Sequence, residues 1–165
     1  MNNEDITKIV PYLYISNWST SNNPEIIEKY NIKAVITLET MDKSLSILSY
    51  YNANNIDFMY IYIYDNENVD ISKYFDSTFN FIEKHIAQKE NVLVHCYAGI
   101  SRSPTIVLNY IIRDIYQSKN IIKPCACSVL DYVLNVVKKK RPINPNEGFM
   151  KQLLIKTQEY ERNIS

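Results

Sequence analysis

Eight residues constrain the fold of this chain more than any other segment: His-Cys-Tyr-Ala-Gly-Ile-Ser-Arg, from His95 to Arg102. They follow a short, wholly apolar run from Val92 to Val94 and precede a run from Ile106 to Tyr116 that is apolar on most faces. A short valine-rich run is typical of a buried strand, and a helix that is apolar on most faces is typical of a core position. We therefore expect a loop that joins a core strand to a central helix.

Other segments alternate between strand-like and helix-like patterns. Strands are expected at Ile9–Ile15 (an edge strand or hairpin), Ala34–Leu38 and Phe58–Tyr64, and helices at Pro24–Tyr30, Met41–Asn55, Asp70–Gln88, from Ser128 to just before Pro142, and from Asn146 to Glu161. This alternation predicts an α/β fold with a central, mostly parallel, twisted sheet of about four or five strands flanked by helices. Ligands of such sheets bind beyond the carboxyl ends of the strands, where the loop after Val94 lies.

Three of the helix starts are predicted from side chains suited to capping. Asp70 is expected to be an N-cap, and Ser128 and Asp131 have the spacing of a capping box. Ser103 is expected to be the N-cap of the central helix, with Pro104 in the first helical position.

The composition argues against several classes of function. The 18 basic and 18 acidic residues balance, so no overall field attracts nucleic acid or a membrane, and we expect neither as a partner. No run approaches the ~18 apolar residues that span a bilayer, and the N-terminus does not resemble a signal peptide. Three cysteines, an odd number, fit reduced thiols better than a disulfide framework. We expect a single domain over residues 1–165, located in the cytoplasm, and leave its oligomeric state open.

The loop from His95 to Arg102 has the composition of an anion site built around a thiol. A thiol is a poor nucleophile until it ionises, and Cys96 opens a loop that leads into a helix N-terminus. The loop amides can converge on one point, where the helix dipole adds positive potential. The amides expected to bind phosphate are those of Tyr97, Ala98, Gly99, Ile100, Ser101 and Arg102. A cradle that favours a thiolate also fits a phosphoryl group, so we expect phosphate esters to be hydrolysed through a covalent cysteine intermediate.

Three residues in and directly after this loop have further roles. Gly99, one of two glycines in the chain, permits a positive φ or a close approach of the backbone. Arg102 supplies a planar fork that grips two phosphate oxygens. The Ser103 hydroxyl can donate a hydrogen bond to the Cys96 sulfur, which would help the sulfur to leave when water attacks the phosphocysteine.

A carboxylic acid must also protonate the leaving oxygen of the ester, and we assign this role to Asp65. Asp65 follows the strand that ends at Tyr64, so it is expected on the same rim of the sheet as Cys96. Glu67 and Asp70 are alternatives in the same loop, although Asp70 is better suited to capping a helix.

Other polar residues have plainer interpretations. His95 is expected to orient the loop by hydrogen bonding to the backbone, and His85 to lie at the surface. Cys125 and Cys127 have too few accompanying ligands for a metal site, so no metal is expected, and their roles stay open. The cationic run from Lys138 to Arg141 is expected to be solvated at a helix end, with contact to acidic or doubly phosphorylated substrates as the alternative.

The run HCYAGISRSPT resembles the signature of the dual-specificity protein phosphatases, within the cysteine-dependent tyrosine phosphatase superfamily. The resemblance covers nearly the whole chain. IVPYLYIS and AVITL are similar to core strands of the family, and YIYIYDNENVDISKYF is similar to its acid loop, where the general acid falls on Asp65. RPINPNEGFMKQL is similar to the segment that packs beneath the catalytic loop and gives Asn146 and Gly148 supporting positions.

This resemblance implies a minimal catalytic domain with a shallow pocket that accepts phosphotyrosine together with phosphoserine or phosphothreonine in phosphorylated proteins. It implies no cofactor, and a loose match gives Arg141 a possible contact with a second phosphate. Small members of the family also occur in large DNA viruses, and a viral member would be expected in the host cytoplasm or the virion. The run Thr37-Leu38-Glu39 departs from the Asn-containing turn that is common in the family.

Three alternatives stay open at this point. A phosphoinositide or RNA 5′-triphosphate phosphatase would use the same chemistry, but the uncharged residues between Cys96 and Arg102 suit a highly anionic substrate less well. A non-catalytic phospho-binding module usually lacks the cysteine, the arginine or the acid, and this chain has all three. A sulfurtransferase also uses a cysteine loop, but it gives Arg102, Ser103 and Asp65 no obvious task.

Overall fold

The computed structural model describes residues 4–118 and 125–163. Its strands are β1 (Ile6–Val10), β2 (Leu13–Ser16), β3 (Ile32–Glu39), β4 (Asp57–Tyr62) and β5 (Asn91–His95). Its helices are α1 (Trp18–Ser21), α2 (Pro24–Lys29), α3 (Leu45–Ala53), α4 (Phe75–Ile86), α5 (Arg102–Gln117), α6 (Ala126–Lys140) and α7 (Glu147–Asn163), with a 3₁₀ turn, η1, at Ser72–Tyr74.

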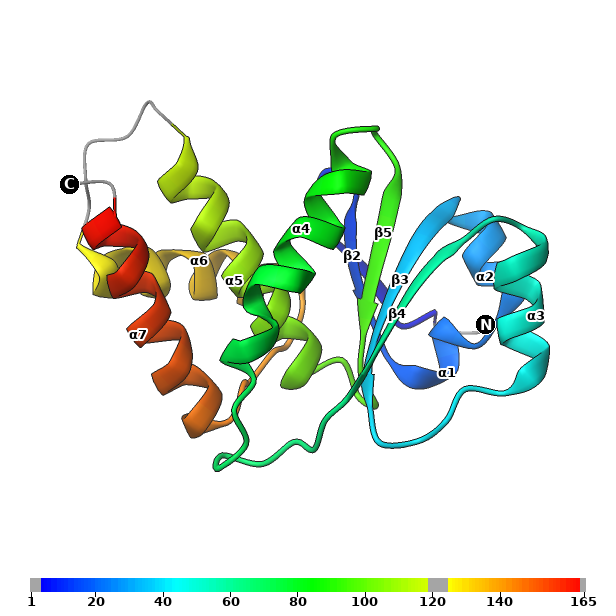
Figure 1. The fold of residues 1–165 in the computed structure, drawn as a ribbon, viewed down its shortest axis with the longest axis horizontal. Coiled ribbons are helices and arrows are strands. Elements are labelled where there is room, and N and C mark those ends of the chain that lie inside the picture. Colours follow the sequence, from blue (N-terminus) through cyan, green and yellow to red (C-terminus); the bar gives the residue numbers. More distant parts are fainter. Residues whose placement is uncertain (1–3, 119–124, 164–165) are drawn as a thin grey trace.

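The strands form one five-stranded sheet in the order β1-β2-β5-β3-β4. β1 and β2 form an antiparallel hairpin, and the pairs β2–β5, β5–β3 and β3–β4 are parallel. Helices α4 to α7 lie on one side of the sheet and α1 to α3 on the other (Figure 1). The α/β prediction with a mostly parallel sheet flanked by helices is therefore confirmed.

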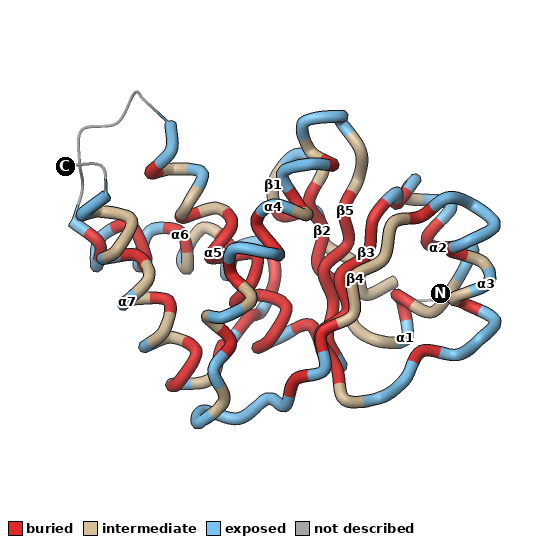
Figure 2. The backbone as a smooth tube through the Cα atoms, in the orientation of Figure 1, coloured by how far each residue is buried: buried red, intermediate tan, exposed pale blue. Residues whose placement is uncertain are grey.

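Side chains of the central strands alternate between two hydrophobic cores, one on each face of the sheet. In β3, Ala34 and Ile36 belong to the larger core, whereas Val35 belongs to the smaller one. In β5, Leu93 belongs to the smaller core. Successive strand residues point to opposite faces, so strands buried on both faces read as continuous apolar runs. Figure 2 shows this burial along the middle of the sheet.

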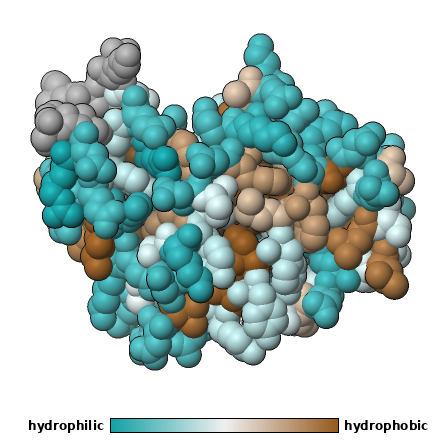
Figure 3. All heavy atoms as spheres, in the orientation of Figure 1, coloured by the Kyte–Doolittle hydropathy of each residue, from teal (hydrophilic) through white to brown (hydrophobic). Residues whose placement is uncertain are grey.

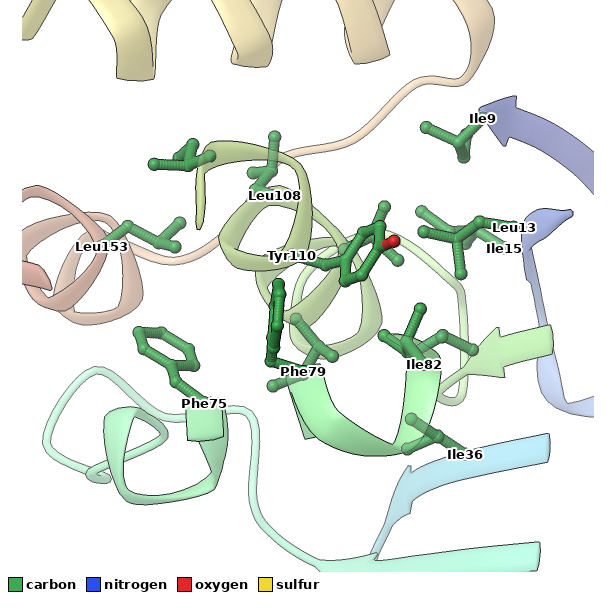
Figure 4. Close-up of a cluster of buried hydrophobic side chains, with 14 of the residues drawn as sticks. Ile9, Leu13, Ile15, Ile36, Phe75, Phe79, Ile82, Leu108, Tyr110 and Leu153 are labelled. Atoms are coloured by element: carbon green, nitrogen blue, oxygen red, sulfur yellow. The ribbon is translucent and has the colours of Figure 1, made fainter. Parts of the chain in front are cut away.

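The larger core fixes α5 against the sheet. Figure 4 shows part of this core, including Ile36 of β3, Ile82 of α4 and Leu153 of α7. The ring centroids of Phe79 on α4 and Tyr110 on α5 lie 5.3 Å apart. Because α5 is held on several sides, the loop that precedes it starts from a fixed helix end.

The start of α5 differs from the prediction. The helix begins at Arg102 with Ser101 in the N-cap position, so Ser103 is not the N-cap and Pro104 is the third helical residue. The Ser103 hydroxyl donates to the Cys96 sulfur at 3.2 Å instead of capping the helix. Proline is tolerated here because the first-turn amides have no partner within the helix.

The starts of α4 and α6 were also predicted wrongly. Asp70 accepts a hydrogen bond from Ser72 N at 2.9 Å, within the 3₁₀ turn region, and α4 begins only at Phe75, with Tyr74 in the N-cap position. α6 begins at Ala126, and the Ser128 hydroxyl lies 3.3 Å from Cys125 Sγ without forming a capping box.

Two other predictions near the helices have opposite outcomes. The last helix was expected to open at Asn146, and α7 begins at the next residue, with Asn146 Oδ1 accepting a hydrogen bond from Phe149 N at 2.9 Å. His85 was expected at the surface, but it is buried between the carboxylates of Asp57 (3.0 Å) and Glu90 (2.6 Å). Those carboxylates come from β4 and the turn after α4, so the pattern of α4 alone did not indicate them.

No helix in the described part of the chain is long and apolar enough to cross a membrane.

Candidate active site

The loop between β5 and α5 folds around the Cys96 sulfur. Cys96 is 2% exposed, and its Sγ accepts hydrogen bonds from Gly99 N at 3.3 Å and from the Ser103 hydroxyl at 3.2 Å. Gly99 has φ of 68°, a left-handed conformation that costs a glycine little. A Cβ on Gly99 would also lie 2.6 Å from the Ser16 carbonyl oxygen. The loop can therefore turn its amides toward the sulfur only with glycine at this position.

Four carbonyl groups of the loop, those of residues 97–100, accept hydrogen bonds from other parts of the fold. Trp18 N donates to the Tyr97 carbonyl at 2.9 Å, and Asn144 N donates to the Ile100 carbonyl at 2.8 Å. Between them, Arg141 donates to the Ala98 carbonyl at 3.2 Å and the Gly99 carbonyl at 2.9 Å.

Apart from Gly99 N, most amides of the same loop donate to nothing within the part of the chain that the structure describes. Among the described residues, the amides of Tyr97, Ala98, Ile100 and Ser101 donate no hydrogen bond. Successive free amides at the start of a helix form a concave site for an anion, and the helix dipole strengthens it. The loop is thus preformed for an oxyanion next to the sulfur.

Arg102 is positioned by a carboxylate that the sequence did not reveal. Its Nη1 donates to Glu39 Oε1 at 3.0 Å and to the Ile63 carbonyl at 3.1 Å, and both charged side chains are almost fully buried. Arg102 Nε and Glu39 Oε2 have no hydrogen-bond partner within the described residues. A buried guanidinium N–H without a partner is costly, so Arg102 holds a donor available for an anion. The only signal for Glu39 is an acidic residue at the end of an apolar strand.

His95 lies in a polar row that crosses the sheet beneath the loop. Ser16, His95, Thr37 and Tyr60 are register partners across β2, β5, β3 and β4. The Thr37 hydroxyl lies 2.6 Å from His95 Nε2, and Ser21 Oγ lies 3.1 Å from Nδ1. Burial, with the charge of Lys43, holds the pKa of His95 well below its usual range. A neutral His95 thus anchors the loop through side chains as well as through the Cys96 carbonyl, 3.3 Å from Nδ1.

Asp65 reaches the catalytic loop from the end of β4. Its Oδ1 accepts hydrogen bonds from the Ser101 hydroxyl at 2.7 Å and from Asn146 Nδ2 at 2.8 Å. Ser101 Oγ also accepts a hydrogen bond from Asn146 N at 3.1 Å. The three side chains join the acid loop, the catalytic loop and the start of α7. The sequence predicted only the amide of Ser101 as functional, and this hydroxyl contact was missed.

The second glycine of the chain brings the acid loop onto α7. A Cβ on Gly148 would collide with the Glu67 carbonyl oxygen, so the two backbones pass in direct contact. Glu67 is exposed, and Asp70 is engaged with Ser72, whereas Asp65 faces the catalytic loop.

Arg141 binds the outside of the loop. Besides the two loop carbonyls, its Nη1 lies 2.6 Å from Asp5 Oδ1 and 3.2 Å from Thr7 Oγ1, and its Nη2 lies 3.0 Å from Asp5 Oδ2. Arg141 is 4% exposed, and each of its nitrogens has a protein partner. A contact with a second phosphate would require these bonds to break.

The remaining cysteines lie apart from this constellation. Cys125 and Cys127 are exposed and free. Residues 4–118 and 125–163 contain no group of three or more His, Cys, Asp or Glu side chains that could hold a metal ion.

Comparison with known proteins agrees with this geometry. The family model described as dual specificity phosphatase, catalytic domain, matches residues 13–159. The chain belongs to the dual specificity phosphatase family. A probable dual specificity protein phosphatase of Dictyostelium discoideum is 39% identical over 153 residues, which are 90% of this chain and 33% of that protein. Human dual specificity protein phosphatase 7 is 31% identical over 157 residues, 95% of this chain and 33% of that protein.

A solved structure of the family has the same fold. The crystal structure of DUSP15 superposes with a TM-score of 0.78 at 28% identity, covering 98% of this chain and 96% of that one. The chain spans about a third of the length of the two curated relatives above. The predicted extent of a single catalytic domain over residues 1–165 stays a prediction.

Proposed function

We propose that this dual specificity phosphatase domain hydrolyses phosphotyrosine and phosphoserine or phosphothreonine esters of proteins through a phosphocysteine on Cys96. The observation that carries the proposal is the loop itself. Its sulfur receives two hydrogen bonds, its carbonyls accept bonds from neighbouring segments, and its free amides and Arg102 Nε remain as donors for an anion. Hydrogen-bond donors fixed around developing charge are the largest single source of catalysis in many enzymes.

The first step transfers the phosphoryl group to the enzyme. The Cys96 thiolate attacks phosphorus, the P–S bond forms and the ester P–O bond breaks, while protonated Asp65 gives its proton to the leaving oxygen. Arg102 and the loop amides hold the three equatorial oxygens throughout.

The second step releases phosphate. Water attacks the phosphocysteine, Asp65 takes the proton of that water, and the P–S bond breaks. The Ser103 hydroxyl, 3.2 Å from the sulfur, stabilises the departing thiolate. Cys96 and Asp65 return to their starting protonation states, so the cycle needs no cofactor.

Replacement of the nucleophile is the primary test. We expect Cys96→Ser to abolish turnover of para-nitrophenyl phosphate and of phosphopeptides while phosphopeptide binding, measured by calorimetry, is retained. Appreciable residual turnover would contradict the proposal. Binding without turnover by the unaltered protein would identify a non-catalytic phospho-binding module instead.

The general acid is tested with a matched pair of variants. Asp65→Asn should lower kcat by about two to four orders of magnitude and remove the basic limb of the pH profile, whereas Glu67→Gln should leave both unchanged. The reverse result would move the role to Glu67. Rates on phosphopeptides, phosphoinositide vesicles and 5′-triphosphorylated RNA decide between a protein and a polyanionic substrate.

A further inference from the structure

Exposed apolar side chains gather on the segments that carry the candidate site. In the described part of the chain eight large hydrophobic side chains are exposed, and six of them end or follow the three adjacent parallel strands β3, β4 and β5. This apolar collar consists of Met41, Leu45, Tyr62, Tyr64, Tyr97 and Ile100, which are 40–83% exposed. The other two, Tyr132 and Ile155, lie on α6 and α7. Figure 3 shows hydrophobic atoms reaching the surface at the end of the molecule that carries α3, which begins at Leu45.

The collar is continuous with the catalytic groups. Tyr97 and Ile100 belong to the catalytic loop itself, and Tyr64 directly precedes Asp65. Tyr62 is the register partner of Glu39, the residue that holds Arg102. A side chain placed in the anion cradle therefore leaves its neighbours in the substrate next to these residues.

Hydrogen bonds fix the β4 side of the collar. The rings of Tyr62 and Tyr64 meet edge to face with centroids 5.7 Å apart, and their hydroxyls lie 3.0 Å from each other. The Tyr60 hydroxyl donates to the carbonyls of Glu39 and Met41 at 3.0 and 3.2 Å, which ties the segment after β3 to β4. Rigid aromatic side chains lose little conformational entropy on binding, so they make effective contact surfaces.

The exposed charges of the collar segments are all acidic. Within residues 40–45, 62–68 and 97–101 the charged residues are Asp42, Lys43, Asp65 and Glu67, and Lys43 is buried. Like charges across an interface cost affinity, whereas opposite charges add to it. A substrate with further negative charge beside its phosphate is therefore disfavoured.

From this arrangement we propose that the collar selects phosphorylated polypeptides with apolar or aromatic residues beside the phosphorylated residue and basic residues beyond them. The inference rests on the proposed function, because it names the substrates of the same site. Tyr62 and Tyr64 are the specificity-determining pair. They contact the residue next to the phosphorylated one, and Asp42 and Glu67 favour cationic positions farther along.

The test uses three phosphotyrosine peptides that differ only beside the phosphotyrosine, with leucine and phenylalanine, with serine, or with aspartate. The unaltered protein should have its highest kcat/KM on the apolar peptide and its lowest on the acidic one. The double variant Tyr62→Ala/Tyr64→Ala should lose about five- to tenfold in kcat/KM on the apolar peptide, mainly through KM, because aromatic contacts are worth about that much. The loss on para-nitrophenyl phosphate should be smaller.

The control is Tyr132→Ala/Ile155→Ala, which removes two side chains of comparable exposure, 65% and 55%, from α6 and α7. This control should leave all three peptides unaffected. Equal losses in the two double variants, or a preference for the acidic peptide, would overturn the inference while phosphopeptide turnover still supported the proposed function. Absence of turnover on every phosphopeptide would instead remove the proposed function on which the inference rests.

Discussion

Ser101 Oγ lies 2.7 Å from Asp65 Oδ1, so the catalytic loop holds the carboxylate that we propose as the general acid. The two residues are separated by 36 positions in the sequence and meet because β4 and β5 end at the same edge of the sheet. The Asn146 amide binds the same carboxylate oxygen, so α7 takes part in the contact. The groups that we propose for phosphate binding and proton donation are thereby held in a fixed geometry.

This contact predicts that Ser101→Ala lowers kcat by an amount that depends on the substrate. A poorly held Asp65 matters most when the leaving oxygen is basic, so kcat should fall roughly tenfold or more on a phosphoserine peptide and less on para-nitrophenyl phosphate. Ser101→Thr, which keeps a hydroxyl, should recover part of the rate. Equal losses on both substrates would show that the Ser101 hydroxyl serves phosphate binding instead.

The buried pair of Glu39 and Arg102 predicts a coupling between stability and anion binding. Glu39→Gln leaves the guanidinium without its charge partner and should lower the free energy of unfolding by about 3 kcal/mol in urea. Added tungstate should stabilise this variant more than the unaltered protein, because the oxyanion restores a negative partner to Arg102. The same tungstate effect in both proteins would contradict this account.

The two glycines predict different defects when each is replaced by alanine. In Gly148→Ala the new Cβ collides with the Glu67 carbonyl, so the acid loop must shift and kcat should fall, with little change in the inhibition constant of inorganic phosphate. In Gly99→Ala the positive φ and the Ser16 carbonyl distort the cradle, and phosphate inhibition itself should weaken. A Gly148→Ala variant with normal kcat would refute the proposed closeness of these backbones.

The parts of the site that lie in one contiguous motif could be predicted from the sequence. Cys96, Gly99 and Arg102 follow one another on a loop whose flanking strand and helix have clear patterns. Asp65 could be placed because strands that alternate with helices bring their carboxyl ends to one edge.

Contacts between distant segments could not be predicted in this way. Glu39 reaches Arg102 across the sheet, and nothing in its local pattern marks it as buried. The start of α5 was misplaced for a related reason. Ser103 has the side chain of an N-cap, but tertiary contact with Cys96 gives its hydroxyl another partner, and local propensity does not report such competition.

Arg141 could support the catalytic loop or contact a second phosphate, and binding measurements separate these two roles. Its guanidinium holds two loop carbonyls and Asp5, so Arg141→Ala should weaken binding of singly and doubly phosphorylated peptides by the same factor. If Arg141 contacted a second phosphate, the loss would be confined to the doubly phosphorylated peptide. Dissociation constants of both peptides, measured on a Cys96→Ser background to prevent turnover, distinguish the two outcomes.

Lys43 is buried, and it forms no ion pair with a carboxylate among residues 4–118 and 125–163. Its Nζ lies 4.9 Å from the centroid of the Trp18 ring and 3.2 Å from Asn22 Oδ1, and burial lowers the pKa of Lys43 to about 7. An unfolded lysine keeps its proton up to a pH of about 10.4. Between pH 7 and 10 the unfolded state therefore binds more protons than the folded state, and stability should rise with pH through this range.

Lys43→Met should remove that dependence. At pH 6 both states of the unaltered protein are protonated at Lys43, and the folded state bears the full cost of a buried charge. The variant should therefore be more stable by ~2–4 kcal/mol at pH 6, since each pKa unit corresponds to about 1.4 kcal/mol and the lost contacts offset part of the gain. The difference should shrink toward pH 10 in urea titrations at pH 6, 8 and 10. A difference that did not change with pH would mean that Lys43 acts through its packing against Trp18 and not through its charge.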